Sequence, residues 1–217
     1  MLLAAEGYET ALVGRTRSKL EDTADQIRHK SKRAVCELMP VDLADAAATE
    51  GLIDRVLDRF GRIDALANVA GTAPFLPIDQ VTRDVWRQCV DTNLSYVVQL
   101  TSTVWPVMKR QHSGVIVNVS SMASVDPFPG LAIYATAKAG LNLFTRCTAR
   151  EGSEIGIKAV AIAPGAIETP MLRSLFDEAA LPRDKTLDPI VVGELIRDCI
   201  TGRRDFDPGE TIQLPSP

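Results

Sequence analysis

The stretch from Gly114 to Gly140 constrains the fold of this chain more than any other part of it. It begins with an apolar, β-branched run, Val115–Val119, which predicts a buried strand that ends at two serines. After a loop rich in proline, a helical run of small residues carries Tyr134 and Lys138. Because these two residues are one helical turn apart, a helix would place a phenol and an ammonium on the same face.

This pair of side chains suggests acid–base chemistry on a carbonyl or an alcohol. A nearby ammonium stabilises a phenolate, so we expect Lys138 to lower the pKa of Tyr134. Ser121, at the end of the preceding strand, could hydrogen-bond the same substrate oxygen. The alternative is that the pair belongs to an ordinary solvated helix face, where Tyr and Lys often lie one turn apart. The remaining motifs bear on this choice.

Apolar runs alternate with amphipathic helical runs along the chain. We predict strands within residues 9–14, 34–43, 63–67, 115–119, 158–163 and 210–214, and helices at 1–6, 18–30, 47–60, 82–111, 131–155 and 190–201. A capping box of Ser18 and Glu21 is expected to start the second helix, and residues 168–189 read as a polar segment containing prolines. The alternation predicts an α/β fold with a Rossmann-type, doubly wound parallel sheet in three α/β/α layers.

Distinctive residues follow the predicted strands. They are Asp42, Asn68–Gly71, Ser120–Ser121 and Pro164–Gly165. In doubly wound folds, ligands bind beyond the carboxyl ends of the strands, so these residues should meet at one edge of the sheet. The sequence therefore predicts a single binding site at that edge.

Composition limits the other classes of function. The chain has 217 residues, fits one domain spanning 1–217, and carries a net charge of -4, which disfavours binding to nucleic acid or to an anionic membrane. Four dispersed cysteines without CxxC spacing and only two histidines disfavour a disulfide framework or a metal site. No run has the length of a membrane span and no leader pattern is evident, so we expect a cytoplasmic protein.

The motifs, in this order and spacing, resemble those of the short-chain dehydrogenase/reductase family over nearly the whole chain. The matches are Asn68-Val69-Ala70-Gly71 for the family's NNAG, Asn93 in DTNL, Ser121 in NVSS, Tyr134 and Lys138 in YxxxK, and Pro164-Gly165 with Thr169 for PGxxxT. The chain is most similar to the 3-oxoacyl-acyl-carrier-protein reductase-like members. The resemblance implies an NAD(P)-dependent oxidoreductase that transfers a hydride between the nicotinamide and a carbonyl or secondary alcohol.

The resemblance also implies a role for each matching residue. Tyr134 would be the general acid in reduction and the general base in oxidation, and Lys138 would assist it and bind the nicotinamide ribose. Ser121 would position the substrate carbonyl, and Asn93 would hold a water of the proton relay. The implied cofactor-binding residues are Arg15, Asp42, Leu43, Asn68, Ala70, Gly71, Tyr134, Lys138, Pro164, Gly165, Ile167 and Thr169. The helices at 82–111 and 131–155 would pack against their symmetry mates in a homodimer or homotetramer.

The choice of cofactor depends on the end of the first predicted strand. In dinucleotide folds an acidic residue at the matching position binds the ribose 2′-OH, whereas a nearby Arg accommodates a 2′-phosphate. This chain has Gly14 there, followed by Arg15 and Arg17. Because a guanidinium pairs well with phosphate, the sequence favours NADP(H) over NAD(H). The alternative is that these arginines only solvate the loop.

The chain departs from the family pattern at its beginning. Family members start with a strand and a glycine-rich TGxxxGxG loop that cradles the pyrophosphate, whereas Met1 aligns within the helix after that loop. The missing strand would lie between those at 9–14 and 63–67, so we expect these two to lack their shared neighbour. Either Met1 is an internal methionine, or the short chain is the product, with a rearranged N-terminal half. In both cases we expect residues 1–217 to bind NADP(H) poorly, because the pyrophosphate loop is absent.

Two other functions remain open at this stage. A degenerate, non-enzymatic scaffold with impaired cofactor binding would account for the absent glycine-rich loop, but not for the four catalytic-type residues. A serine hydrolase based on Ser121 is disfavoured because the chain lacks a G-x-S-x-G elbow and a well-placed histidine. The substrate is not specified by the sequence; the expected apolar lining is Phe75, Met122, Phe128 and Met171.

Overall fold

The computed structural model describes residues 1–32 and 34–217, which form two compact units at residues 1–63 and 64–217. Each unit has its own parallel sheet, with the order β1-β2 in the first and β3-β4-β5-β6 in the second. In the described chain β1 (Thr10–Gly14) and β3 (Ala65–Asn68) therefore share no neighbouring strand, as the sequence led us to expect. That residues 1–217 act as a single domain stays a prediction.

The unit at residues 1–63 consists of a two-stranded sheet and its helices. β1 pairs in parallel with β2 (Cys36–Pro40), from Thr10 opposite Cys36 to Gly14 opposite Pro40. Its helices are α1 (Leu2–Ala5), α2 (Arg17–Lys30) and α3 (Leu52–Phe60). α2 lies against both strands and buries residues at helical spacing, namely Leu20, Ala24 and Ile27.

Two helix starts in this unit differ from the prediction. α2 begins at Arg17 after Thr16, whose side chain makes no capping bond, so the predicted capping box of Ser18 and Glu21 is wrong. The third helix begins at Leu52 rather than near residue 47. Asp45 accepts hydrogen bonds from backbone N–H groups two and three residues later, which forms a turn there. Gly51 then takes φ 70, a left-handed conformation that separates this turn from the helix.

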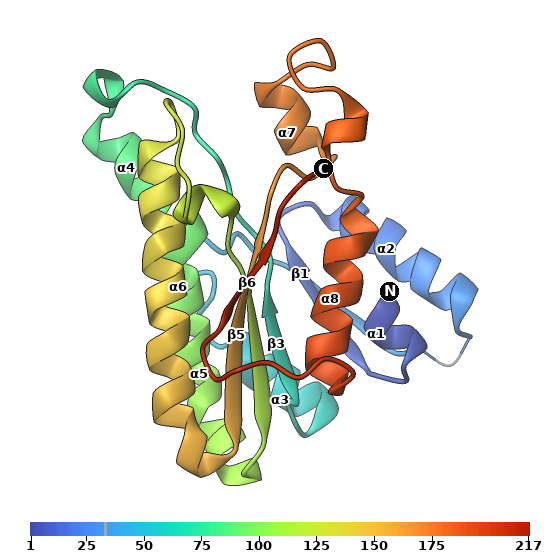
Figure 1. Cartoon of the computed structure of the whole chain (residues 1–217). Helices are drawn as coiled ribbons and strands as arrows, with labels where there is room; N and C mark the ends of the chain where they lie inside the picture. Colours follow the sequence, from blue (N-terminus) through green and yellow to red (C-terminus); the bar gives the residue numbers. More distant parts are fainter. Residues whose placement is uncertain (33) are drawn as a thin grey trace. The chain divides into compact units, whose positions relative to one another are not determined.

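The unit at residues 64–217 contains the larger sheet, with helices on both of its faces. The other strands are β4 (Gly114–Val119), β5 (Ile157–Pro164) and β6 (Thr211–Leu214), and all pairs are parallel. Figure 1 shows α5 (Tyr96–Gln111) and α6 (Ala132–Gly152) on one side and α8 (Pro189–Thr201) on the other. This arrangement confirms the predicted Rossmann-type parallel sheet between helical layers.

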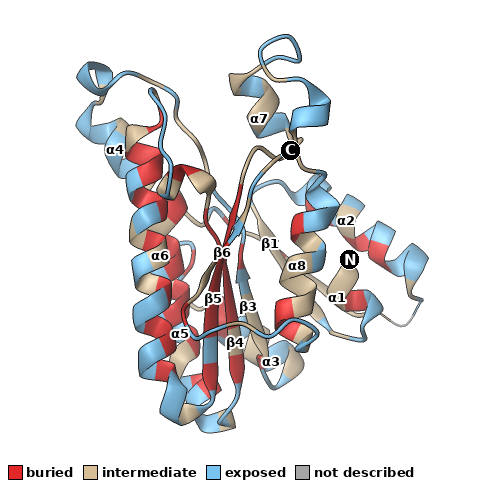
Figure 2. Cartoon of the chain, in the orientation of Figure 1, coloured by how far each residue is buried: buried red, intermediate tan, exposed pale blue. Residues whose placement is uncertain are grey.

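The core of this unit lies along the two central strands. β4 and β5 are buried over most of their lengths, as Figure 2 shows, because helices cover both faces of the sheet. Their continuous apolar runs in the sequence follow from this double coverage. In contrast, β3 and β6 are only partly buried.

Two segments of this unit differ from the prediction. The expected helix at 82–111 consists of α4 (Arg83–Val90) and α5, joined by a π-helical stretch, η2 (Asp91–Ser95). The expected irregular segment at 168–189 contains α7 (Pro170–Leu175), which Thr169 caps by accepting a hydrogen bond from the Leu172 N–H. Proline at the first position of this helix suits its fixed backbone angle.

Candidate active site

The carboxyl ends of the strands bring three of the predicted motifs to one edge of the larger sheet. Asn68 ends β3, Ser120 and Ser121 follow β4, and Gly165 follows β5. The register aligns them, since Asn68 lies opposite Asn118 on β4, and Val119 at the end of β4 lies opposite Ile162, two residues before the end of β5. Three of the four predicted groups therefore meet at one edge of the sheet within residues 64–217, and that they form a binding site stays a prediction.

Tyr134 and Lys138 lie in the first turns of α6, and both are buried. The Nζ of Lys138 donates a 2.8 Å hydrogen bond to the carbonyl oxygen of Val119, the last residue of β4. It lies 5.8 Å from the centre of the Tyr134 ring. The side chain of Ser121 accepts a hydrogen bond from the N–H of Ala123, which holds the start of the loop after β4.

The ionisation of this pair differs from the expectation. Burial raises the pKa of Tyr134, although a hydrogen bond with Ser121 acts in the opposite direction. The expected lowering by Lys138 is therefore wrong for this structure, in which the ammonium is directed to a strand carbonyl. Burial also lowers the pKa of Lys138 from 10.5 to about 8. The phenol is thus held protonated at neutral pH.

Asn93 lies in the π-helical stretch and is completely buried. Its Nδ2 donates 2.8 Å hydrogen bonds to the carbonyl oxygens of Thr72 and Cys89, and its Oδ1 accepts from the Thr72 N–H at 3.3 Å. The amide thus links α4 to the loop after β3. A Cβ added at Gly71 would lie 2.7 Å from Asn93 Oδ1, so the loop can approach this closely only with glycine there.

Asn68, predicted to bind cofactor, has its side chain in the core. Its Nδ2 donates to Asn118 Oδ1 at 2.8 Å, and Asn118 Nδ2 donates in turn to Thr145 Oγ1 at 2.8 Å. This chain of buried amides joins β3, β4 and α6 behind the site. Nearby, the carbonyl of Ala70 accepts a 3.0 Å hydrogen bond from the hydroxyl of Tyr96 on α5. Asn68 and Ala70 therefore hold the loop that leads to the site.

A cavity of about 690 Å³ opens over Tyr134. The predicted site residues that line it are Gly71, Ser121, Tyr134, Lys138, Pro164, Gly165, Ile167 and Thr169. Of the expected substrate-side residues, Met122, Phe128 and Met171 line it, whereas Phe75 does not. Asn68, Ala70 and Asn93 also lie outside the lining and support it from behind. The volume is within the range of small-molecule sites.

The remaining predicted cofactor residues belong to the unit at residues 1–63. Arg15 follows β1, and its Nη1 lies 4.0 Å from Asp42 Oδ2, with both side chains exposed. Asp42 Oδ1 also accepts a 3.0 Å hydrogen bond from the Ala44 N–H, in a turn that follows β2. Leu43, beside it, is half-buried. An exposed ion pair at this distance is weak, so Arg15 is easily redirected to another anion.

Three residues at the site were missed by sequence reasoning. Cys89 is buried against Asn93, with its Sγ 3.7 Å from the amide nitrogen. Phe176 lines the cavity from the end of α7, and Arg173 binds the backbone around it. No hydrophobic periodicity in the sequence indicates these three positions. For Phe176, the only available signal was an aromatic residue at the end of a short helix with a capping threonine.

Comparison with known proteins identifies the family. The family model for short chain dehydrogenase matches residues 1–180. The chain belongs to the short-chain dehydrogenase family. It is 34% identical to the 3-oxoacyl-[acyl-carrier-protein] reductase FabG of Staphylococcus aureus over 177 residues. The aligned region covers 81% of this chain and 71% of the relative. Short-chain dehydrogenases are NAD(P)-dependent oxidoreductases that act on CH–OH and C=O groups, and this chain is one of them.

Solved structures have the same fold. Levodione reductase superposes with a TM-score of 0.91 at 26% identity, over 98% of this chain and 88% of that one. A 3-ketoacyl-(acyl-carrier-protein) reductase from Brucella melitensis, complexed with NADH, gives a TM-score of 0.87 at 23% identity, over 98% and 88% of the two chains. At 23% identity, the likeness to the Brucella melitensis reductase supports the fold alone.

The helices of the described residues include none with the length and apolar character of a membrane span.

Proposed function

We propose that the chain interconverts a ketone and a secondary alcohol with NADP(H), and that Tyr134 is the residue that transfers the proton. The observation that carries the proposal is the buried phenol of Tyr134 at the floor of the cavity, beside Ser121 and Lys138. The phenol is protonated at neutral pH; burial makes it a weaker acid, whereas its hydrogen bond with Ser121 lowers the pKa and so favours donation to a developing alkoxide.

The other residues have positioning roles in this proposal. Ser121 orients the carbonyl oxygen towards Tyr134, since both side chains line the same cavity. Lys138 holds the cofactor ribose and the proton relay, because its ammonium is fixed to the Val119 carbonyl and reaches the cavity. Asn93 fixes the loop at Thr72 and, through it, the wall formed by Gly71. Such fixed geometry lowers the entropic cost of reaching the transition state.

The residues at the cavity fit the nicotinamide end of a dinucleotide. Lys138 supplies a cation and Thr169 supplies a hydroxyl. The backbone at Gly165, in the loop after β5, is close-packed, since a Cβ added there would lie 2.6 Å from the backbone nitrogen of Ser216. Ile167, which also lines the cavity, is proposed to contact the nicotinamide, and Asp42, Leu43 and Ala70 to contact the remainder of the cofactor. When bound, a reduced nicotinamide supplies the hydride to the carbonyl carbon.

NADP(H) is preferred to NAD(H) in this proposal because of Arg15 and Arg17. Arg15 follows β1 directly and is exposed, and no carboxylate stands at the preceding position, which is Gly14. A guanidinium there suits a 2′-phosphate. A cytoplasmic location, and a homodimer or homotetramer built on α4, α5 and α6, are further parts of the proposal.

The test is cofactor oxidation by the purified chain with a panel of ketones. We expect NADPH to be consumed in the presence of a ketone, and Tyr134→Phe to lower kcat by a factor of about 100 to 10,000. The variant removes one hydroxyl, so its melting temperature and circular dichroism should match those of the native chain. Turnover that survives in Tyr134→Phe would refute the role of Tyr134. Absence of turnover with every ketone would favour a non-enzymatic scaffold.

A further inference from the structure

The cavity over Tyr134 is poor in charge. Among the residues that the structure describes, its lining contains two charged side chains, Asp126 and Lys138. The ammonium of Lys138 binds the Val119 carbonyl and, in the proposed function, is also engaged by the cofactor ribose, and Asp126 would repel an anion. A substrate carboxylate or phosphate entering this space would lose its hydration without gaining a partner, which is costly. The site therefore disfavours anionic substrates.

Three phenylalanines from distant segments meet at the apolar side of this cavity. The rings of Phe75 and Phe176 make an edge-to-face contact, with centroids 5.5 Å apart, and those of Phe128 and Phe176 lie 6.2 Å apart. Phe176 is thus the centre of the cluster, and both it and Phe128 line the cavity. Bulky apolar neighbours continue the wall, namely Met122, Leu131, Leu172 and Leu181.

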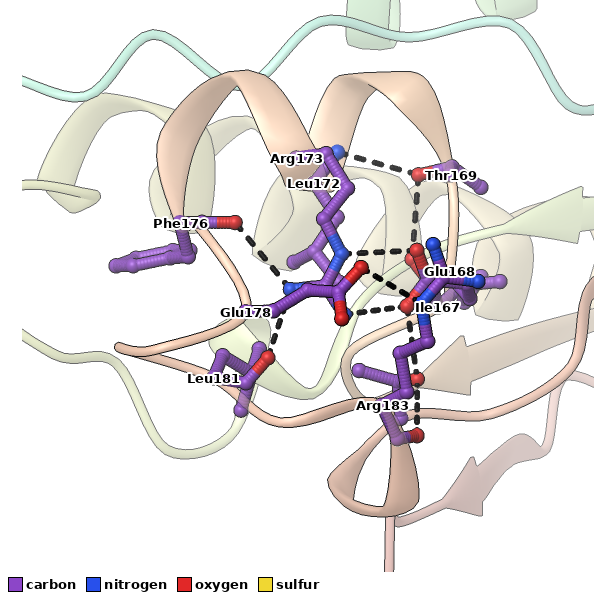
Figure 3. A network of polar contacts seen from close by, with 10 residues as sticks. Ile167, Glu168, Thr169, Leu172, Arg173, Phe176, Glu178, Leu181 and Arg183 are labelled. Carbon is purple, nitrogen blue, oxygen red and sulfur yellow. Dashed lines mark hydrogen bonds and ion pairs between the residues drawn. The ribbon is translucent and has the colours of Figure 1, made fainter.

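Phe176 is held in place through its backbone. Figure 3 shows Arg173 reaching the carbonyl oxygens of Phe176 and Leu181, at 3.4 and 2.7 Å from its Nη1. The same guanidinium binds both carboxylate oxygens of Glu168, with its Nε 2.8 Å from Oε1. This bond lowers the pKa of Glu168 to about 2, so the carboxylate is charged throughout the neutral range. One side chain thus fixes the turn on each side of the phenyl ring.

The ends of this segment are fixed as well. Ile167 and Leu187 form a parallel β-bridge, in which Leu187 N–H donates to the Ala166 carbonyl at 2.8 Å and Glu168 N–H donates to the Leu187 carbonyl at 2.9 Å. Thr186 also donates to Glu168 Oε2 at 3.2 Å. The segment that carries Phe176 is therefore closed at its base and cross-linked inside, which suits a rigid wall.

We propose that this cavity selects neutral ketones that carry a bulky apolar group, with Phe176 as the specificity-determining residue and Arg173 as the residue that positions it. The inference rests on the proposed function, because it takes the cavity over Tyr134 to be the substrate site. An apolar ring system would pack against the phenylalanine cluster and gain from leaving water. A small ketone would not reach the cluster, and a charged one would lack a partner.

The test compares three ketones in the same cofactor assay: 2-tetralone as the bulky neutral probe, acetone as the small one and 3-oxohexanoate as the anionic one. We expect kcat/KM for 2-tetralone to exceed that for 3-oxohexanoate by at least about tenfold. Phe176→Ala should lower kcat/KM for 2-tetralone about tenfold and leave that for acetone within about twofold. Phe206→Ala, which removes a half-buried ring outside the cavity lining, is the matched control.

The positioning role of Arg173 is tested by measuring whether its replacement changes KM or kcat. Arg173→Gln should raise KM for 2-tetralone about tenfold while kcat for acetone is retained, since only the wall moves. Arg173→Lys should rescue KM only in part, because an ammonium cannot bind a carboxylate and two carbonyls in one planar arrangement. A loss of melting temperature without a change in KM would show that Arg173 has no positioning role.

A binding measurement separates this inference from the proposed function. Titration calorimetry of 2-tetralone into the chain requires no turnover. If no ketone is reduced but 2-tetralone binds and Phe176→Ala weakens it, the proposed reaction fails and the cavity assignment stands. If ketones are reduced but the anionic probe is preferred, or Phe176→Ala affects all three alike, the selectivity proposal is overturned and the reaction stands. If 2-tetralone neither binds nor reacts, the selectivity proposal is overturned.

Discussion

The Nζ of Lys138 and the carbonyl oxygen of Val119 are joined by a 2.8 Å hydrogen bond that fixes α6 to the end of β4. The bond locates the ammonium next to the loop that carries Ser121, and therefore relates the helix residues of the site to the strand residues. It also satisfies one donor of a cation that is almost completely withdrawn from water. Burial of this kind has a measurable consequence for stability.

The stability of the chain should depend on the titration of Lys138. Its pKa is about 8 in the folded chain and 10.5 ordinarily, so between these values the unfolded state binds a proton that the folded state does not. Stability therefore rises with pH through this window. We expect the free energy of unfolding of the native chain, measured by urea at pH 8 and 10.5, to increase relative to that of Lys138→Met. Parallel pH curves for the two proteins would contradict the assignment.

The sequence predicted the positions of the candidate site residues better than it described their environment. The strands could be predicted because β4 and β5 are buried on both faces and leave continuous apolar runs, and the register of parallel strands then aligned Asn68, Ser121 and Gly165. The pKa of Tyr134 could not be predicted in the same way. It depends on burial by segments distant in sequence and on the direction of one ammonium, neither of which the spacing of Tyr134 and Lys138 specifies.

Helix starts and long-range aromatic contacts were also beyond the sequence. The turn made by Asp45 shifts the start of α3 from residue 47 to Leu52, although several residues between the turn and the helix have good helix propensity. α7 was missed because six residues are too few to show a helical period. The contact between Phe75 and Phe176 joins loops that are far apart in the chain, so no local pattern could indicate it.

Replacing Asn93 should affect stability as well as turnover. Asn93→Ala removes the side-chain partner of the carbonyls of Thr72 and Cys89 and of the Thr72 N–H, which are buried or partly buried. The Cys89 carbonyl keeps a 3.4 Å contact from the Thr92 hydroxyl. We expect a loss of about 2 to 3 kcal/mol in the free energy of unfolding, together with a fall in kcat. Ser95→Ala, at an exposed hydroxyl on the same π-helical stretch, should cost less than about 0.5 kcal/mol. Equal small losses in the two variants would argue against the network.

The buried amide chain behind the site should be a coupled unit. Asn118 accepts from Asn68 and donates to Thr145, so Asn118→Leu leaves a donor and an acceptor unpaired in the core. We expect this variant to lose about 3 kcal/mol, measured by chemical unfolding. The double variant Asn68→Leu with Asn118→Leu should lose less free energy of unfolding than the sum of the losses of the two single variants. The reason is that the second substitution removes the donor that the first leaves unpaired. Strict additivity would show that the two amides act independently.

The preference for NADP(H) can be tested at Arg15. Its Nη1 is 4.0 Å from an exposed carboxylate of Asp42, a pair that contributes at most about 1 kcal/mol, so the guanidinium can turn to a 2′-phosphate at little cost. A charge-assisted bond to phosphate is stronger, and Arg15→Ala should therefore raise the Kd for NADPH by about tenfold. NADH, which lacks that phosphate, should bind with an affinity changed by less than about twofold if the loss of one bond is the sole effect.

Arg28→Ala is the matched control, because it removes an exposed arginine that pairs with Asp25 on α2 in the same unit. It removes one positive charge, as Arg15→Ala does, and so corrects for long-range attraction of the more anionic cofactor. Fluorescence titration of both cofactors with both variants decides the question. Equal weakening of NADPH and NADH by Arg15→Ala would mean that the arginine contacts a part common to the two, and that the end of β1 does not select the phosphate.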